Sequence, residues 1–337
     1  MKFLIIGLGS MGKRRVRNLL ALDEKEIAGF DISNERTLEA KQKYEIETFT
    51  DFQKAIDTFK PDVLIISTPP NLHMKYAYYA YENNMHCFIE ASVVDSDKIL
   101  ALHKKVKESK LIIVPSCTMA YFPAPIKLKE LINSKIIGEP LNFNYHSGQY
   151  LPDWHPWEKI EDFYVSNPNT GGCREIVPFE LTWINELFGD STALACVKRK
   201  LTNMNADIDD IYHSILEYEN NMILNLTVEV ISRPEAVREF RLLGTKGEIV
   251  YSSDSEILKY INIDMKEWEE ISFKKGTIEA QYINPEEPYI NEMKDFIDAI
   301  IKKDISMFPN DLEKDYKILN TLYLLEDLAG ENNELSR

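Results

Sequence analysis

The stretch that decides the fold is FLIIGLGSMGKRRVRNLLAL, residues 3–22. It opens with a short apolar run, passes through three glycines, and ends in a segment with an apolar stripe at helical spacing. A strand, a glycine-rich turn and a helix in this order are typical of the first unit of a dinucleotide-binding sheet. Gly7 allows the tight turn, Gly9 lets a pyrophosphate approach the backbone, and Gly12 allows the helix to pack closely on the strand. The amides at the start of the helix then face the anion.

The first third of the chain repeats this alternation of strand and helix. Short apolar runs without alternation are typical of parallel strands that are covered on both faces. They are FLIIG (3–7), EIAGF (26–30), DVLIIS (62–67), HCFIE (86–90) and LIIVP (111–115), and helical stretches such as 13–22, 74–83 and 97–109 lie between them. The pattern predicts an α/β fold whose N-terminal part is a Rossmann-type, doubly wound parallel sheet.

From about residue 119 the pattern changes to longer segments that alternate between polar and apolar residues. These segments, 139–150, 191–201, 213–231 and 237–252, predict an antiparallel sheet with one covered face. Helices are expected near 123–134, 289–302 and 311–329. We therefore predict two domains, residues 1–118 for binding NAD(P) and residues 119–337 for an α+β domain with an open-faced, mainly antiparallel sheet.

The charge balance limits the kinds of partner. Lys and Arg total 39 against 55 Asp and Glu, which gives a formal net charge of -16. Such a surface repels phosphate backbones and anionic lipid, so we expect no nucleic-acid or membrane partner and favour a small molecule. The first helix carries a basic run, Lys13, Arg14, Arg15 and Arg17, which we interpret as a solvated face, with a phosphate contact as the alternative.

The cysteines predict neither disulfides nor a metal site. They are scattered over Cys87, Cys117, Cys173 and Cys196, without a CxxC pair and without a histidine at zinc spacing. The apolar run at the N-terminus is too short for a signal sequence. A reducing cytoplasm is the expected location.

Asp31 favours NAD as the cofactor. It ends the second predicted strand, where a carboxylate can accept a hydrogen bond from the adenosine ribose and repel a 2′-phosphate. The alternative is a glycine turn with an ordinary surface aspartate. Arg36, five residues further on, keeps NADP possible.

STPPNLH (67–73) follows the strand predicted at 62–67, and its two prolines stiffen the turn where ligands of open sheets bind. Together with GLGSMG, Asp31, HCFIE and the segments 121–143 and 242–251, it resembles the glucose-fructose oxidoreductase, inositol dehydrogenase and MocA family. The resemblance implies a sheet domain that often forms dimers or tetramers. It also implies oxidation or reduction of a sugar, polyol or nucleotide-linked sugar with NAD or NADP. The expected cofactor-binding residues are Gly7, Leu8, Gly9, Ser10, Met11, Gly12, Asp31, Ser67, Thr68, Pro69, Pro70, Asn71, His73 and Glu90.

The chain departs from this family at its usual proton-transfer positions. Ala91 follows Glu90 where similar proteins carry a lysine, and Ile176 and Phe179 stand at the usual aspartate and histidine. Glu175 and Glu180 each lie one place away. They could act only if the helix is shifted or rotated, and Pro178 suggests that the regular helix begins there.

Hydride transfer still needs a group that handles the hydroxyl proton. Our first candidate for the base is His155, because imidazole titrates near neutral pH, and Glu175 or Glu180 comes second. The expected substrate-binding residues are His146, Tyr150, Trp157, Tyr164 and Arg174. The alternative is an aromatic loop that packs on a neighbouring subunit and carries solvated histidines. Arg174 would hold a carboxylate or phosphate, or form a surface ion pair with Glu175.

The expected function is hydride transfer between nicotinamide and a hydroxyl or keto carbon of a sugar or nucleotide-linked sugar. The GQYLPDW-like run (148–154) suggests bacterial surface-sugar biosynthesis by resemblance. Two alternatives stay open. One is a catalytically silent dinucleotide-binding sensor or assembly subunit, and the other is a lyase or glycosidase that reduces and regenerates NAD within each turnover. A homodimer or homotetramer formed through the C-terminal sheet is expected.

Overall fold

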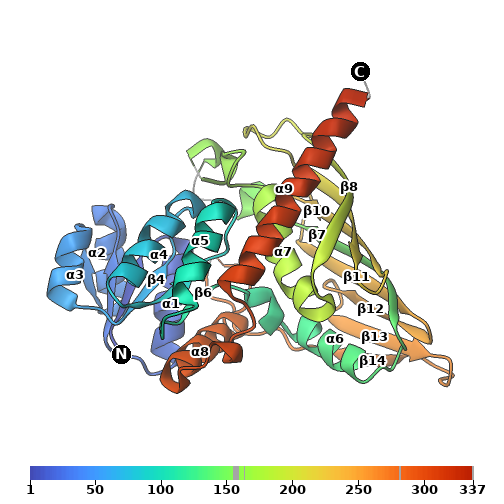
Figure 1. Cartoon of the computed structure of the whole chain (residues 1–337), viewed down its shortest axis with the longest axis horizontal. Helices are drawn as coiled ribbons and strands as arrows, with labels where there is room; N and C mark the ends of the chain where they lie inside the picture. Colours follow the sequence, from blue (N-terminus) through green and yellow to red (C-terminus); the bar gives the residue numbers. More distant parts are fainter. Residues whose placement is uncertain (155–158, 163, 281, 336–337) are drawn as a thin grey trace. The chain divides into compact units, whose positions relative to one another are not determined.

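The computed structural model describes residues 1–154, 159–162, 164–280 and 282–335 (Figure 1). The chain forms two compact units. The first contains Met1–Thr118 and Thr277–Tyr316, and the second contains Met119–Gly276 and the residues from Lys317 onward.

The first unit is built on a six-stranded sheet in the order β3-β2-β1-β4-β5-β6. Its strands are β1 (Phe3–Ile6), β2 (Ile27–Phe30), β3 (Glu47–Phe49), β4 (Val63–Ile66), β5 (His86–Ile89) and β6 (Ile113–Pro115). All of their pairings are parallel. This strand order is that of a doubly wound dinucleotide-binding sheet, in which ligands bind where the order reverses, here between β1 and β4. The predicted fold class of this part is confirmed.

Helices follow the strands in the expected order. Those of the first unit are α1 (Ser10–Ala21), α2 (Asn34–Tyr44), α3 (Phe52–Phe59), α4 (His73–Glu82), α5 (Ser96–Val106) and α8 (Glu287–Lys302), with 3-10 turns η1 (Pro70–Leu72) and η6 (Ile305–Met307). The strands β1, β2 and β4 are buried along their whole length, as their continuous apolar sequences predict.

The helix α8 lies in the first unit, whereas the sequence-based division placed it in the second domain. Its Phe296 packs edge-on against Phe88 of β5, with 5.5 Å between the ring centroids. Its buried Glu292 accepts hydrogen bonds from the Ser116 hydroxyl and the Cys117 amide. The apolar stripe of a helix predicts that one side is buried, but it does not identify the sheet that covers it.

The second unit contains an eight-stranded sheet in the order β14-β13-β12-β11-β7-β10-β9-β8. Its strands are β7 (Pro140–Gly148), β8 (Ser191–Arg199), β9 (Ile211–Tyr218), β10 (Ile223–Glu229), β11 (Val237–Gly244), β12 (Gly247–Ser252), β13 (Ile257–Asn262) and β14 (Glu269–Ser272). Only the central pair β7 and β10 is parallel, and the other pairs are antiparallel. The prediction of a mainly antiparallel second sheet is confirmed.

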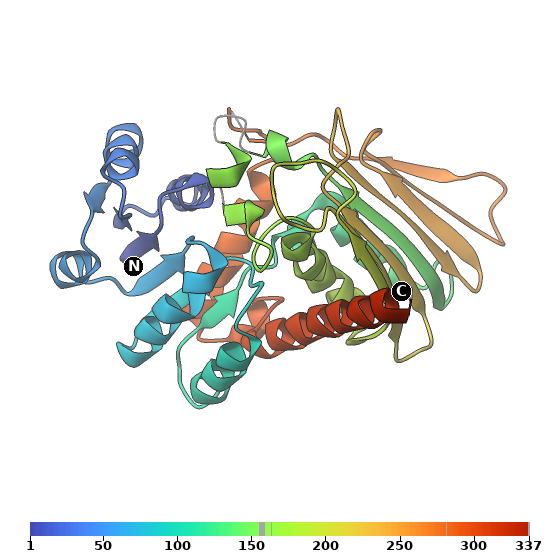
Figure 2. The same cartoon turned by 90° about the horizontal axis from the view of Figure 1, so that it is seen from above.

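One face of this sheet is covered by helices. They are α6 (Pro123–Asn133), α7 (Cys173–Phe188) and α9 (Leu312–Leu335), and the 3-10 turns are η2 (Thr118–Tyr121), η3 (Leu151–Asp153), η4 (Ile160–Asp162) and η5 (Tyr164–Ser166). Figure 2 shows the green α7 and the red α9 on the same side of the strands. Tyr218 and Tyr212 of β9 point to that side and contact Asn185 and Glu326.

The start of α7 differs from the prediction. The helix begins at Cys173, so Pro178 lies inside it rather than at its first turn. Pro178 has no backbone donor, so the helix loses a hydrogen bond there, but it continues to Phe188. Among the described residues, no helix combines the length and the apolar character needed to span a membrane.

Candidate functional site

The turn between β1 and α1 has the geometry that its glycines predicted. Gly7 has a φ of +92°, and a Cβ at this position would come within 2.6 Å of the Ser67 carbonyl oxygen. A Cβ on Gly12 would overlap the carbonyl oxygen of Gly7. Both positions therefore exclude side chains, and they hold the helix directly against the end of β1.

Gly9 leaves space for a ligand. A Cβ there would meet only the guanidinium of Arg36, at 3.9 Å. Within the described residues no side chain caps α1 at its N-terminus, and its first turn contains no acidic residue. The unpaired amides of this turn thus fit a negatively charged group, and the space above Gly9 fits its close approach. The residues present are suited to a dinucleotide pyrophosphate.

Asp31 is buried beside this turn. Its carboxylate accepts hydrogen bonds from the amides of Leu8 and Ser33, both at 2.8 Å. A nitrogen of the Arg36 guanidinium lies 3.7 Å from it. A carboxylate has about four acceptor positions, so Asp31 can brace the turn and still accept a ribose hydroxyl. The nearby cation keeps a 2′-phosphate possible, as predicted.

The loop after β4, which contains Ser67, Thr68, Pro69, Pro70 and Asn71, is fixed by His73. The His73 ring is 2% exposed, and its Nε2 lies 2.8 Å from the Thr68 carbonyl oxygen. Burial lowers the pKa of His73, so the ring is neutral and its Nε2 donates to that carbonyl. His73 therefore orients the loop, and its predicted place among the cofactor-binding residues stays a prediction.

Glu90, at the end of β5, is engaged by an arginine. Nε and Nη2 of Arg15 donate to its two carboxylate oxygens at 2.7 and 3.0 Å, and the Ser67 hydroxyl lies 3.3 Å away. Burial opposes the charge of Arg15, but Glu90 and Glu292 raise its pKa above the ordinary value. Arg15 cannot replace the missing lysine as a proton carrier, because its guanidinium stays charged.

A buried carboxyl that the sequence analysis missed belongs to the same unit. Asp315, in the first turn of α9, is 4% exposed, and burial raises its pKa to about 7, with an opposing effect of the Ser92 hydroxyl. No pattern in the sequence connects Asp315 with Ser92, because the two residues are far apart along the chain.

In the second unit, Glu175 has the properties of an acid–base group. It lies in the first turn of α7, and its Oε1 accepts a 2.7 Å hydrogen bond from the Tyr164 hydroxyl. Its Oε2 is buried and has no hydrogen-bond partner among the described residues. Burial raises the pKa of Glu175 to about 7, against the opposing effect of Tyr164. The structure thus brings together two of the residues predicted for catalysis and substrate binding.

Glu180 is placed differently, and the structure argues against its predicted role as a base. It is 0% exposed, and its carboxylate accepts hydrogen bonds from four side chains of the core, Tyr145, Ser147, Trp183 and Arg238. These four donors match the roughly four acceptor positions of a carboxylate, so Glu180 is fully engaged in the core. Glu180 lies one position after Phe179, which turns it to the sheet side of α7.

The other predicted substrate residues have separate partners. Nε2 of His146 lies 3.1 Å from Glu229, and this hydrogen bond raises the pKa of His146. The ring of Tyr150 stacks under the guanidinium of Arg233 at 4.4 Å. His155, the first candidate for the base, and Trp157 lie outside the described residues.

Arg174 lies on a cavity of about 370 Å³ within the second unit. It pairs with Glu326 at 2.7 Å rather than with Glu175 as considered from the sequence. The other lysines and carboxylates of the cavity also form pairs, Lys198 with Asp209 and Lys200 with Asp207. The cavity is therefore polar but balanced in charge. No cluster of metal ligands occurs among the described residues, and the prediction of no metal site remains a prediction.

Two family models match the chain. Residues 1–114 match an oxidoreductase family with an NAD-binding Rossmann fold, and residues 126–250 match the GFO/IDH/MocA C-terminal domain. The chain belongs to the GFO/IDH/MocA family. The match confirms the family predicted from the motifs, and the NAD-binding domain confirms the predicted type of cofactor.

One curated protein and several solved structures resemble this chain at low identity. D-xylose 1-dehydrogenase (NADP(+)) of Hypocrea jecorina is 23% identical over 240 residues, which cover 64% of this chain and 60% of that protein. A structure of levoglucosan dehydrogenase in complex with NADH is 19% identical and superimposes with a TM-score of 0.83 over 98% of this chain and 97% of the other. UDP-N-acetylglucosamine 3-dehydrogenase from Acidithiobacillus ferrooxidans is 18% identical, with a TM-score of 0.76 over 97% of each chain. These similarities support the fold.

Proposed function

We propose that this GFO/IDH/MocA protein is an NAD(P)-dependent dehydrogenase or reductase that acts on a CH–OH group of a sugar, and that Glu175 and Tyr164 handle the proton. The proposal depends mainly on one observation. Glu175 is a buried carboxyl with a pKa of about 7, a hydrogen bond to a phenol and one oxygen for which the described part of the chain offers no partner. These are the properties of a group that exchanges a proton near neutral pH.

Oxidation of an alcohol removes a hydride and a proton. The dinucleotide supplies the hydride acceptor when it is bound by the turn at Gly7–Gly12. The carboxylate of Glu175 is proposed to take up the hydroxyl proton, either directly on Oε2 or through the Tyr164 hydroxyl, which already donates to Oε1. In the reverse direction protonated Glu175 returns the proton to the carbonyl oxygen. This arrangement would replace the lysine that is absent at Ala91.

The relatives support a sugar as substrate. Their names describe enzymes that act on D-xylose, levoglucosan and a UDP-linked amino sugar. More specifically, we propose that the substrate is a nucleotide-linked sugar of a surface-sugar pathway. The cavity at Arg174 offers hydrogen-bonding side chains of both charges for such a substrate, although its paired cations add no net positive charge.

We further propose a homodimer or homotetramer formed through the uncovered face of the eight-stranded sheet, and a reducing, cytoplasmic location. The exposed side chains of Val197, Ile215 and Leu243 lie on strands of this sheet. All four cysteines are free and buried. Light scattering of the purified chain tests the oligomer, since a monomer at micromolar concentration would contradict it.

The test of the catalytic assignment is Glu175→Gln, with Tyr164→Phe as a second variant. We expect kcat/KM for sugar oxidation to fall by roughly 10²- to 10⁴-fold in Glu175→Gln, because an amide cannot accept the proton. In the unmodified protein kcat/KM for oxidation should rise with pH and level off above about 7, since the base must be deprotonated. In Glu175→Gln this rise of kcat/KM with pH should be absent. Nicotinamide absorbance is the measurement.

Glu186→Gln is the matched control, because Glu186 lies on the same helix but pairs with Lys129 at the surface. It should keep full activity. Undiminished activity of Glu175→Gln would contradict the assignment of Glu175 as the group that takes up the proton. NADH binding without turnover on any sugar or nucleotide sugar would favour the sensor alternative, and product formation without a net absorbance change would favour the lyase or glycosidase alternative.

A further inference from the structure

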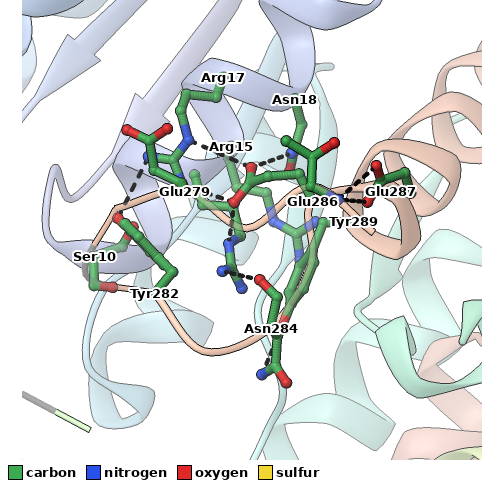
Figure 3. Close-up of polar contacts among 12 residues, drawn as sticks. Ser10, Arg15, Arg17, Asn18, Glu279, Tyr282, Asn284, Glu286, Glu287 and Tyr289 are labelled. Atoms are coloured by element: carbon green, nitrogen blue, oxygen red, sulfur yellow. Dashed lines mark hydrogen bonds and ion pairs between the residues drawn. The ribbon is translucent and has the colours of Figure 1, made fainter. Parts of the chain in front are cut away.

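The basic run of α1 is not the solvated face that the sequence suggested. Arg14 is 3% exposed and Arg15 is 0% exposed. Arg14 and Arg17 are covered by a segment from near the other end of the chain, residues 277–280 and 282–289, which we call the strap. Figure 3 shows the strap lying along α1. Both belong to the first unit.

Glu286 anchors the strap to one side of α1. Glu286 is 7% exposed, and its carboxylate accepts hydrogen bonds from Nε of Arg14 at 3.0 Å, Nη2 of Arg17 at 2.9 Å and Nδ2 of Asn18 at 3.2 Å. A buried carboxylate with three charged or polar donors is expensive to separate from them, because each group would be left desolvated and unpaired. The contact fixes the strap on the helix.

Aromatic rings of the strap hold the same arginines. The guanidinium of Arg14 lies between Tyr282 and Tyr289, at 4.6 and 4.0 Å from the ring centroids. Arg17 lies 4.4 Å from the centroid of Tyr282. These cation–π contacts determine where the Tyr282 ring lies.

The ring of Tyr282 in turn places its hydroxyl on the glycine turn. The hydroxyl donates a 2.8 Å hydrogen bond to the carbonyl oxygen of Ser10, the first residue of α1. That carbonyl shares a planar peptide group with the amide of Met11. Holding the Ser10 oxygen therefore also sets the direction of the Met11 N–H, one of the unpaired amides available to an anion.

We propose that the strap is a positioning element for coenzyme binding, and that Tyr282 acts through the Ser10–Met11 peptide group to orient the phosphate-binding amides. The inference rests on the proposed binding of a dinucleotide at the glycine turn. Because coupling between two binding events is reciprocal, a bound coenzyme should also stabilise the strap on α1.

The variant that tests this is Tyr282→Phe, which keeps the ring over the arginines and removes only the hydroxyl. Tyr44→Phe is the matched control, because the Tyr44 hydroxyl bonds to Arg17 at 3.2 Å and is not bonded to the turn. By titration of NADH fluorescence we expect the Kd of Tyr282→Phe to rise roughly 2- to 10-fold, the value of one hydrogen bond. The Kd of Tyr44→Phe for NADH should stay within about twofold of the Kd of the unmodified protein. The KM for sugar at saturating coenzyme should not change in either variant.

Equal Kd values for the two variants would overturn the inference, whatever their thermal stabilities. A protein that binds neither NADH nor NADPH would overturn the proposed function itself, and with it this role of the strap. Hydrogen exchange of the unmodified protein gives a second measurement that needs no variant. NADH should slow exchange of the strap amides, and the absence of such protection in a protein that binds NADH would contradict the coupling.

Discussion

Glu175 and Glu180 lie on the same helix, and their surroundings differ so much that we propose a role in proton transfer for Glu175 only. Glu175 is held by one phenol and is left with an oxygen that can exchange a proton. Glu180 forms an ion pair with Arg238 at 3.2 Å and accepts three further hydrogen bonds. The sequence identified both as carboxylates near the predicted site. It could not separate them, because the distinction depends on strands β7 and β11 that are distant along the chain.

We therefore predict that Glu180→Gln lowers the stability of the protein and has no direct effect on the catalytic step. Removing the negative charge breaks the ion pair with the largely buried Arg238, and the loss of one partner of a buried pair typically costs about 3–5 kcal/mol. Urea denaturation measures the free energy of unfolding. Glu186→Gln, at an exposed ion pair of the same helix, should change it by less than about 1 kcal/mol. A Glu180→Gln variant that is as stable as this control would show that the buried pair does not stabilise the fold.

At the scale of elements, the unit formed by β1, the glycine turn and α1 was predictable from its sequence. The residues of the motif act locally, so their spacing alone specifies the strand, the turn and the start of the helix. The start of α7 was not predictable in this way. The sequence placed it at Pro178, because a proline favours a first turn, but the packing of Ile176 and Val177 in the core extends the helix back to Cys173.

The glycines of the turn predict a pair of variants with different outcomes. Gly9→Ala adds a methyl group that meets only Arg36 at 3.9 Å, in an ordinary backbone conformation. It should leave the thermal midpoint nearly unchanged and weaken NADH binding by at least roughly tenfold, since the methyl group occupies the space for the pyrophosphate. Gly12→Ala would overlap the Gly7 carbonyl and should lower both stability and binding.

Thermal unfolding followed by circular dichroism, together with NADH titration, measures the two effects separately. If Gly9→Ala binds NADH as tightly as the unmodified protein, the pyrophosphate does not lie above Gly9. If Gly12→Ala is as stable as the unmodified protein, the close packing of α1 on β1 is not required for the stability of the fold.

At the scale of the whole molecule, the sequence predicted two sheets and their types, but not the division of the chain between the units. Residues 277–316 carry Glu286, Glu292 and Phe296 into the core of the first unit. Their partners are Arg14, Arg15 and Phe88. In the sequence these residues belong to an ordinary helix and an ordinary strand, and nothing there indicates that they need partners from another segment. A buried ion pair between segments so far apart has no signal in a single sequence.

A fragment of residues 1–118 is therefore expected not to fold on its own. It would leave Arg15 without Glu292 and Phe88 without Phe296. We expect no cooperative transition in urea and no NADH binding for this fragment. Adding a peptide of residues 277–316 should restore both. Cooperative unfolding of the fragment without the peptide would mean that α8 is dispensable for the first unit.

The return of α8 to the first sheet has a consequence for synthesis on the ribosome. The glycine turn and all six strands of the first sheet emerge early, yet Glu286, which pairs with Arg14, and Glu292, the second carboxylate at Arg15, are translated only after the entire second sheet. At usual translation rates the interval between residues 118 and 316 is about 10–40 s. During that time the nascent chain carries Arg14 without its carboxylate and Phe88 without Phe296. It is therefore a natural client for chaperones, and the dinucleotide fold is completed among the last steps rather than the first.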